Sequence, residues 1–96
     1  MAEAEVEVRN PSGLHARPAA AFVRAAGALA VDVRVANLTR DPQKEVSAKS
    51  VLGVMGLGVA RGHRIRLAAD GPDGETAVST LAELVASGLG ETVEGE

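Results

Sequence analysis

The 96-residue chain has the length of one compact domain, and its 46% apolar content is enough to build a hydrophobic core. Its formal net charge of -3 is spread along the chain and Phe22 is its one aromatic residue, which argues against a nucleic-acid-binding protein with a basic face and a stacking platform. Because the chain has no cysteine, no apolar run of about 18 residues and an acidic amino terminus, we expect a cytoplasmic protein without disulfides, membrane insertion or a signal peptide.

The first half of the chain predicts a strand, a helix and two further strands. Apolar and charged residues alternate over 4–10, which indicates a strand covered on one face. A turn at NPSG leads into a helix over 16 to about 28, whose buried stripe has the spacing i, i+3, i+4, i+7: Ala19, Phe22, Val23 and Ala26. Alternation returns over 31–38, and a polar loop containing Pro42 separates this strand from a short one over 45–49.

The second half predicts a short helix, a strand and a longer helix. The segment 50–58 is apolar but rich in glycine, so its helix has low intrinsic stability. Residues 63–70 alternate again, and the helix over 75–87 ends before Gly88 with this inward stripe: Val78, Leu81, Ala82 and Val85. We expect the tail from residue 91 onward to be loose.

The order of the predicted elements is therefore β-α-β-β-α-β-α. Every strand alternates and so has one wet face, whereas parallel strands buried between helices would be continuous apolar runs. The sequence predicts an α+β fold, an open-faced β-sandwich in which three helices pack on one face of a four-stranded, mainly antiparallel sheet. We expect a single domain over residues 1–96, ordered from about 3 to 90.

The stretch GLHARPAA places a histidine at the start of the first helix. Gly13 allows a tight turn, and Pro18 is tolerated only in a first helical turn, so His15 is expected at about the N-cap. The N–H groups of Ala16 and Arg17 are then unpaired and, with the positive end of the helix dipole, form an anion site. The same field disfavours a charged imidazole and leaves a neutral ring nitrogen available.

This turn offers a nucleophile beside a receptor for phosphoryl oxygens. The planar cation of Arg17 suits phosphate oxygens, so the chemistry that the stretch supports best is a covalent phosphohistidine at His15. The alternative is an ordinary polar histidine at a helix start, which its neighbours make the weaker interpretation. Ser12 either contacts the phosphoryl group or is a plain turn serine.

GLHARPAA resembles the active-site signature of the HPr family, the histidine phosphocarriers of the bacterial phosphoenolpyruvate-dependent sugar phosphotransferase system. KSVLGVMGLG, residues 49–58, is similar to the second signature of that family, a serine that opens a short helix before a glycine-rich apolar run. GLGE near the carboxyl end is also similar, and the resemblance extends from about Glu3 to Glu91.

The resemblance implies that His15 accepts a phosphoryl group on Nδ1 from phosphorylated enzyme I and passes it to sugar-specific enzyme IIA proteins during sugar uptake. It also implies that Arg17 holds the phosphoryl oxygens. Ser50 falls where many family members carry a regulatory serine that an ATP-dependent kinase phosphorylates, although it also suits an ordinary N-cap. The tail VEGE overhangs the family pattern and weakens any role for a carboxyl-terminal carboxylate beside Arg17.

The short helix cannot bury all of its apolar side chains. We expect Leu52 and Met55, together with Ala20, to form a partner-docking patch near His15, as the corresponding helix does in the family. His63 is expected to be an ordinary surface or strand-edge histidine. Without cysteines or paired histidines at ligand spacing, neither a metal nor another cofactor is expected.

Three functional hypotheses follow. The first is a monomeric phosphocarrier, a relay rather than a turnover enzyme, since the sequence shows neither nucleotide binding nor activation of a small substrate. The second is a regulatory binding module controlled by phosphorylation of Ser50, although the intact GLHARP argues against a purely regulatory role. The third is the same module within a larger phosphotransferase chain, such as the phosphotransfer subunit of a dihydroxyacetone kinase.

Overall fold

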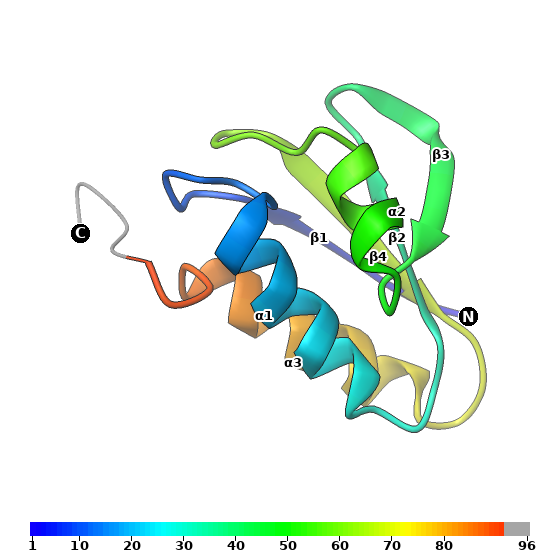
Figure 1. Cartoon of the computed structure of the whole chain (residues 1–96). Helices are drawn as coiled ribbons and strands as arrows, with labels where there is room; N and C mark the ends of the chain where they lie inside the picture. The colour runs from blue at the N-terminus through cyan, green and yellow to red at the C-terminus, as the bar shows by residue number, and fades with distance from the viewer. Residues whose placement is uncertain (92–96) are drawn as a thin grey trace.

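The computed structural model describes residues 1–91, and this part of the chain forms four strands and three helices in the predicted order (Figure 1). The elements are β1 (Ala2–Glu7), α1 (Ala16–Gly27), β2 (Val33–Asn37), β3 (Asp41–Ser47), α2 (Val51–Gly56), β4 (Arg64–Ala69) and α3 (Gly74–Ala86). The sheet has the order β1-β4-β2-β3, and all of its pairs are antiparallel. The helices lie on one face of this sheet, so the predicted open-faced α+β architecture is confirmed (Figure 1). No helix within residues 1–91 is long and apolar enough to cross a membrane.

The register of the sheet separates an apolar face from a charged face. β4 lies between β1 and β2, and its Leu67 is directly opposite both Ala4 and Val35 on the face toward the helices. On the other face, Arg66 of β4 forms an ion pair with Glu45 of β3 at 3.3 Å. Alternation along the sequence therefore reports correctly which side of β1, β2 and β4 packs on the core.

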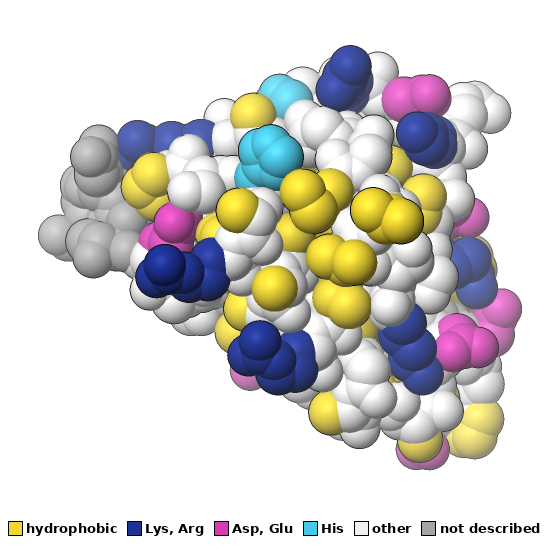
Figure 2. All heavy atoms as spheres, viewed as in Figure 1, with side chains coloured by type: hydrophobic (Ala, Val, Ile, Leu, Met, Phe, Trp, Pro, Cys, Tyr) yellow, Lys and Arg dark blue, Asp and Glu magenta, His cyan; other side chains and the backbone are white. Residues whose placement is uncertain are grey.

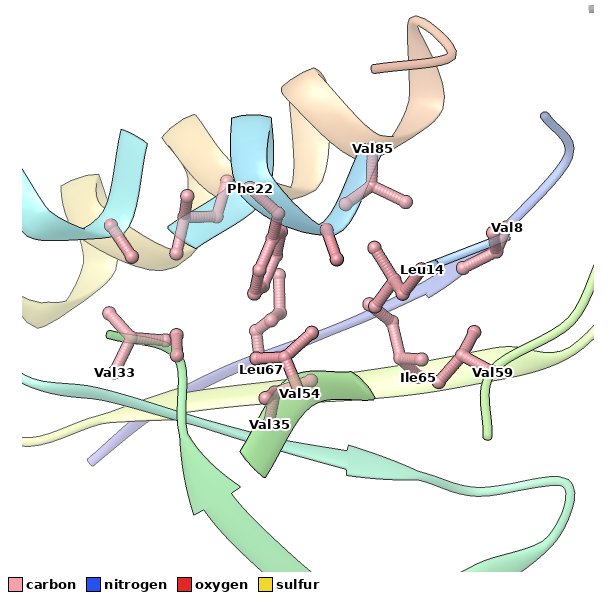
Figure 3. Close-up of a cluster of buried hydrophobic side chains, with 14 of the residues drawn as sticks. Val8, Leu14, Phe22, Val33, Val35, Val54, Val59, Ile65, Leu67 and Val85 are labelled. Carbon is pink, nitrogen blue, oxygen red and sulfur yellow. The ribbon is translucent and has the colours of Figure 1, made fainter. Parts of the chain in front are cut away.

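The core lies between the sheet and the helices. Figure 3 shows the ring of Phe22 pointing from α1 toward Leu67 of β4, and both side chains are fully buried. The predicted helical stripes are confirmed, with Val23 and Ala82 partly buried and the remaining members buried. Leu14, next to His15, is only 1% exposed and belongs to the same cluster. The candidate site is thus attached directly to the core.

The predicted loop around Pro42 is wrong in its extent. β3 begins at Asp41 and includes Pro42, so the connection from β2 is shorter than expected. The register between β2 and β3 shifts between Ala36 and Asn37. A proline lacks the N–H that a central strand needs, but β3 is an edge strand and six of its seven residues are exposed. An edge strand of this kind shows little of the alternation on which the sequence prediction relied.

Because Phe22 is fully buried, we expect its removal to destabilise the protein. Replacing Phe22 by Ala removes most of a fully buried ring, so we expect the free energy of unfolding to fall by about 3–5 kcal/mol, measured by urea denaturation. Arg24→Ala, on the exposed side of the same helix, is the control and should change it by less than about 0.5 kcal/mol. Equal losses in the two variants would contradict the assignment of the core.

Candidate functional site

The backbone before α1 is held in one place by its contacts. The N–H of Leu14 donates to the carbonyl oxygen of Val59 at 3.0 Å, and the side chain of Leu14 is buried. Gly13 has a φ of +59°, and a Cβ at this position would collide with the same carbonyl oxygen. The side chain of Asn10 donates from Nδ2 to the carbonyl oxygen of Gly13 at 2.9 Å. These contacts explain why glycine occupies position 13 and why His15 has a defined place.

His15 is the N-cap of α1, as predicted, with an extended backbone (φ -129°, ψ 151°). Its ring is exposed and makes no capping hydrogen bond, and no residue within 1–91 donates to it or accepts from it. The N–H groups of Ala16 and Arg17 have no carbonyl partner in the same part of the chain. The predicted combination of an open imidazole and unpaired amides is therefore present in the structure.

Ala16 has a φ of +47°, in the left-handed region. A residue with a Cβ pays about 1–2 kcal/mol for this conformation, and such strain persists only where surrounding contacts impose it. Leu14 on one side and the buried Pro18 on the other provide those contacts. The strain was not predicted, because neither composition nor periodicity signals a left-handed alanine.

A pocket of about 200 Å³ joins the start of α1 to the end of α2. It is lined by Pro11, Ser12, Leu14, His15, Met55, Gly58, Val59, Ala60 and Arg61. Figure 2 shows hydrophobic side chains gathered beside a histidine on this face, with basic side chains around them. The predicted residues Ser12, His15 and Met55 thus share one surface feature, although Met55 lies 40 positions after His15 in the sequence.

The other predicted site residues, on α1 and at the start of α2, do not line this pocket. Leu52 is 81% exposed on α2, whereas Ala20 on α1 is half-buried, and the two helices are in contact. Arg17 is exposed in the first turn of α1. Ser50 is the N-cap of α2, as the sequence allowed, and its Oγ accepts a hydrogen bond from the N–H of Gly53 at 3.0 Å. Ser50 does not line the His15 pocket.

Glu91 is a site residue that the sequence analysis missed. Its Oε1 accepts hydrogen bonds from the N–H of Ser12 and from Nδ2 of Asn10, each at 3.0 Å, and its Oε2 accepts from the Ser12 hydroxyl at 2.8 Å. The expectation of a loose tail is therefore wrong for Glu91, while residues 92–96 lie outside the described part. A contact between residues 79 positions apart leaves no periodic or local signal, and only the similarity at GLGE drew attention to this segment.

These hydrogen bonds affect the titration of Glu91. The side chain of Asn10 and then the N–H and hydroxyl of Ser12 lower the pKa of the Glu91 carboxyl, and the charge of Arg17 lowers it further. Because the pKa is lowered in the folded chain, this contact stabilises the fold above the carboxyl's ordinary pKa. The stabilisation is lost as the pH falls through the folded-state value.

His63 lies just before β4, but it is more than a surface histidine. Its ring is half-buried, and Nδ1 accepts from the N–H of Ala60 at 3.2 Å and lies 3.1 Å from Nδ2 of Asn37. Asn37 is 1% exposed, and its Oδ1 accepts from two backbone N–H groups of the following turn. His63 therefore braces the wall of the His15 pocket. No group of three or more acidic, histidine or cysteine side chains within residues 1–91 is placed to hold a metal ion.

An open histidine over unpaired amides, on a four-stranded open-faced sandwich, defines a candidate acceptor site for a phosphoryl group. A family model described as the PTS HPr component phosphorylation site matches residues 2–87. The chain therefore belongs to the HPr family of phosphocarriers of the phosphotransferase system.

Individual relatives agree with this assignment. The phosphocarrier protein HPr of Streptomyces coelicolor is 49% identical over 94 residues, which cover 98% of both chains. The multiphosphoryl transfer protein of Haemophilus influenzae is 43% identical over 86 residues, and these cover 90% of this chain but 17% of that protein. A crystal structure of HPr from Thermoanaerobacter tengcongensis has a TM-score of 0.86 and 41% identity, covering 97% of this chain and 100% of that one.

Because Ala16 has a positive φ, we expect glycine at this position to stabilise the protein, whereas glycine within a helix usually destabilises it. Ala16→Gly relieves about 1–2 kcal/mol of strain at an entropic cost of about 0.4–1 kcal/mol, so we expect a gain of about 0.5–1 kcal/mol in the free energy of unfolding. Ala21→Gly, within the same helix, should instead cost about 1 kcal/mol. Thermal and urea unfolding measure both, and destabilisation by Ala16→Gly would contradict the strain.

Proposed function

We propose that this chain is a cytoplasmic phosphocarrier in which His15 accepts a phosphoryl group on Nδ1 from phosphorylated enzyme I and passes it to enzyme IIA proteins during sugar uptake. The observation that carries this proposal is the open His15 ring at a strained helix start whose first two N–H groups have no partner among the described residues. Membership of the phosphocarrier family supports the same reaction.

The transfer requires only the neutral ring and a seat for the phosphoryl oxygens. The lone pair of His15 Nδ1 forms the new N–P bond while the bond between phosphorus and its donor atom breaks, and the donor keeps that electron pair. The proton on Nε2 stays on the ring, so acceptance needs no separate general base. The N–H groups of Ala16 and Arg17 and the guanidinium of Arg17 are the proposed donors to the phosphoryl oxygens, with Ser12 as a further one. Release to an acceptor is the same step in reverse.

Partner proteins have an apolar surface on which to dock beside this seat. Leu52 is 81% exposed and Val51 is 41% exposed, both on α2, and Met55 reaches the His15 pocket. With Ala20 on α1, these residues form the proposed docking patch. A partner that covers it excludes water from the histidine during transfer and strengthens the electrostatic interactions there. Val51 adds to the residues that the sequence predicted.

Ser50 supports a second, regulatory function. Its side chain is exposed, caps α2 and directly precedes the docking patch. Phosphorylation by an ATP-dependent serine kinase would add about -1.5 to -2 charges there, which would oppose docking through a desolvated apolar surface. The relation to a multiphosphoryl transfer protein also supports the third hypothesis, in which the module works inside a longer chain.

The proposed relay is tested by incubating the protein with phosphoenolpyruvate, magnesium and enzyme I. We expect acid-labile phosphate on the unmodified protein and on His63→Gln, but none on His15→Ala, because only His15 offers an unoccupied ring at a phosphoryl seat. Acid-labile phosphate on His15→Ala would refute the assignment. Labelling found only with ATP, stable to acid and lost in Ser50→Ala, would favour the regulatory module instead.

The proposed role of Arg17 in holding the phosphoryl oxygens is tested separately with Arg17→Ala. Loss of a charged hydrogen-bond donor, about 1.5–3 kcal/mol, should slow transfer from enzyme I by about 10- to 100-fold. Arg24→Ala, exposed on the same helix away from the first turn, is the matched control and should transfer at the normal rate. Rapid-quench measurement gives the rates, and circular dichroism should show unchanged folding. A normal rate for Arg17→Ala would contradict the proposal that its guanidinium holds the phosphoryl oxygens.

A further inference from the structure

The Glu91 carboxylate occupies hydrogen-bond donors that belong to the phosphoryl seat. Ser12 lines the same pocket as His15, and both its N–H and its hydroxyl donate to Glu91. Asn10, which is fully buried, adds a third hydrogen bond to the carboxylate. An anionic group is therefore already held next to the position that a phosphoryl group on His15 would take.

The turn after α3 places the Glu91 carboxylate beside Ser12. After α3, Gly88 has a φ of +97° and Leu89 a φ of +53°, and the N–H of Glu91 donates to the carbonyl oxygen of Gly88 at 2.9 Å. Leu89 is only 4% exposed, so the turn is anchored in the core despite the cost of a left-handed leucine. Figure 1 shows that residues 87–91, which follow α3, lie on the side of the molecule where the β1–α1 loop lies.

We propose that Glu91 is a positioning residue which holds the turn before His15 and opposes phosphorylation of that histidine through its charge. The inference rests on the proposed phosphocarrier function. A phosphoryl group brings about -1.5 to -2 charges into the pocket, where it is repelled by the carboxylate and competes with it for the donors of Ser12. The phosphoryl group and the Glu91 carboxylate also compete for the charge of Arg17, which lowers the pKa of Glu91.

The coupling is reciprocal. If phosphorylation of His15 weakens the contact of Glu91 with Ser12, then the ionised Glu91 weakens the hold on the phosphoryl group by the same factor. The consequence is a phosphohistidine that gives up its group more readily to an acceptor. A carrier benefits from this, because it has to release the group as well as accept it.

Glu91→Gln separates the charge from the shape of the contact. A glutamine retains an oxygen that accepts from Ser12 and Asn10, but it carries no charge, whereas Glu91→Ala removes both properties. Glu83→Gln provides the matched control, because Glu83 is an exposed acid on α3 outside the pocket. All of these variants leave His15 and Arg17 untouched.

The measurement is the equilibrium distribution of radioactive phosphoryl groups between enzyme I and this protein, started from labelled phosphoenolpyruvate. We expect Glu91→Gln to shift the distribution toward His15 by about 3- to 10-fold at low ionic strength and by less at high salt, with Glu83→Gln unchanged. No shift, a shift toward enzyme I, or a shift seen only in Glu91→Ala would overturn the inference. Absence of acid-labile phosphate from the unmodified protein would instead refute the proposed function itself.

Discussion

The packing of Leu14 and Gly13 against the backbone of Val59 is the constraint on which the candidate site depends. The buried leucine and its hydrogen bond to Val59 fix the chain immediately before α1, and the left-handed glycine lets the two backbones approach closely. Because this contact is part of the core, it is strong enough to hold Ala16 at its unfavourable positive φ. His15 is then exposed at the N-cap, beside amides that no group in residues 1–91 pairs.

In the proposed function, the surroundings of His15 combine groups that attract a phosphoryl anion with one that opposes it. The amides of Ala16 and Arg17, which have no partner within residues 1–91, and the Arg17 guanidinium are the proposed attractive groups, while the Glu91 carboxylate already accepts hydrogen bonds from Ser12. Such a balance suits a protein that holds a phosphoryl group only between two partners, since a seat with attractive contacts alone would retain it. Met55 of α2 lines the same pocket, so the proposed docking patch and the proposed phosphoryl site share one surface. The open face of the sheet, with its ion pairs, lies on the other side.

Most of the fold was predictable because burial leaves a periodic record in the sequence. The stripes on α1 and α3 and the alternation of β1, β2 and β4 report a core on one side of each element, and the structure confirms them. β3 was predicted less well. Its edge position exposes both faces and tolerates Pro42, so the residues that mark a loop and those that form this strand are alike.

The residues of the candidate site also fall into two groups, those that a local pattern in the sequence predicts and those that it does not. The sequence by itself determined the start of α1, with His15 at the N-cap, Arg17 in the first turn and Ser50 capping α2, because caps and first turns are set by neighbouring residues. The resemblance to the family already suggested Met55 near His15, but only the tertiary structure decided the other distant contacts: His63 with Asn37, and Glu91 with Ser12. These contacts connect segments far apart in the chain, and each rests on the packing of whole elements, which no local pattern of residues encodes.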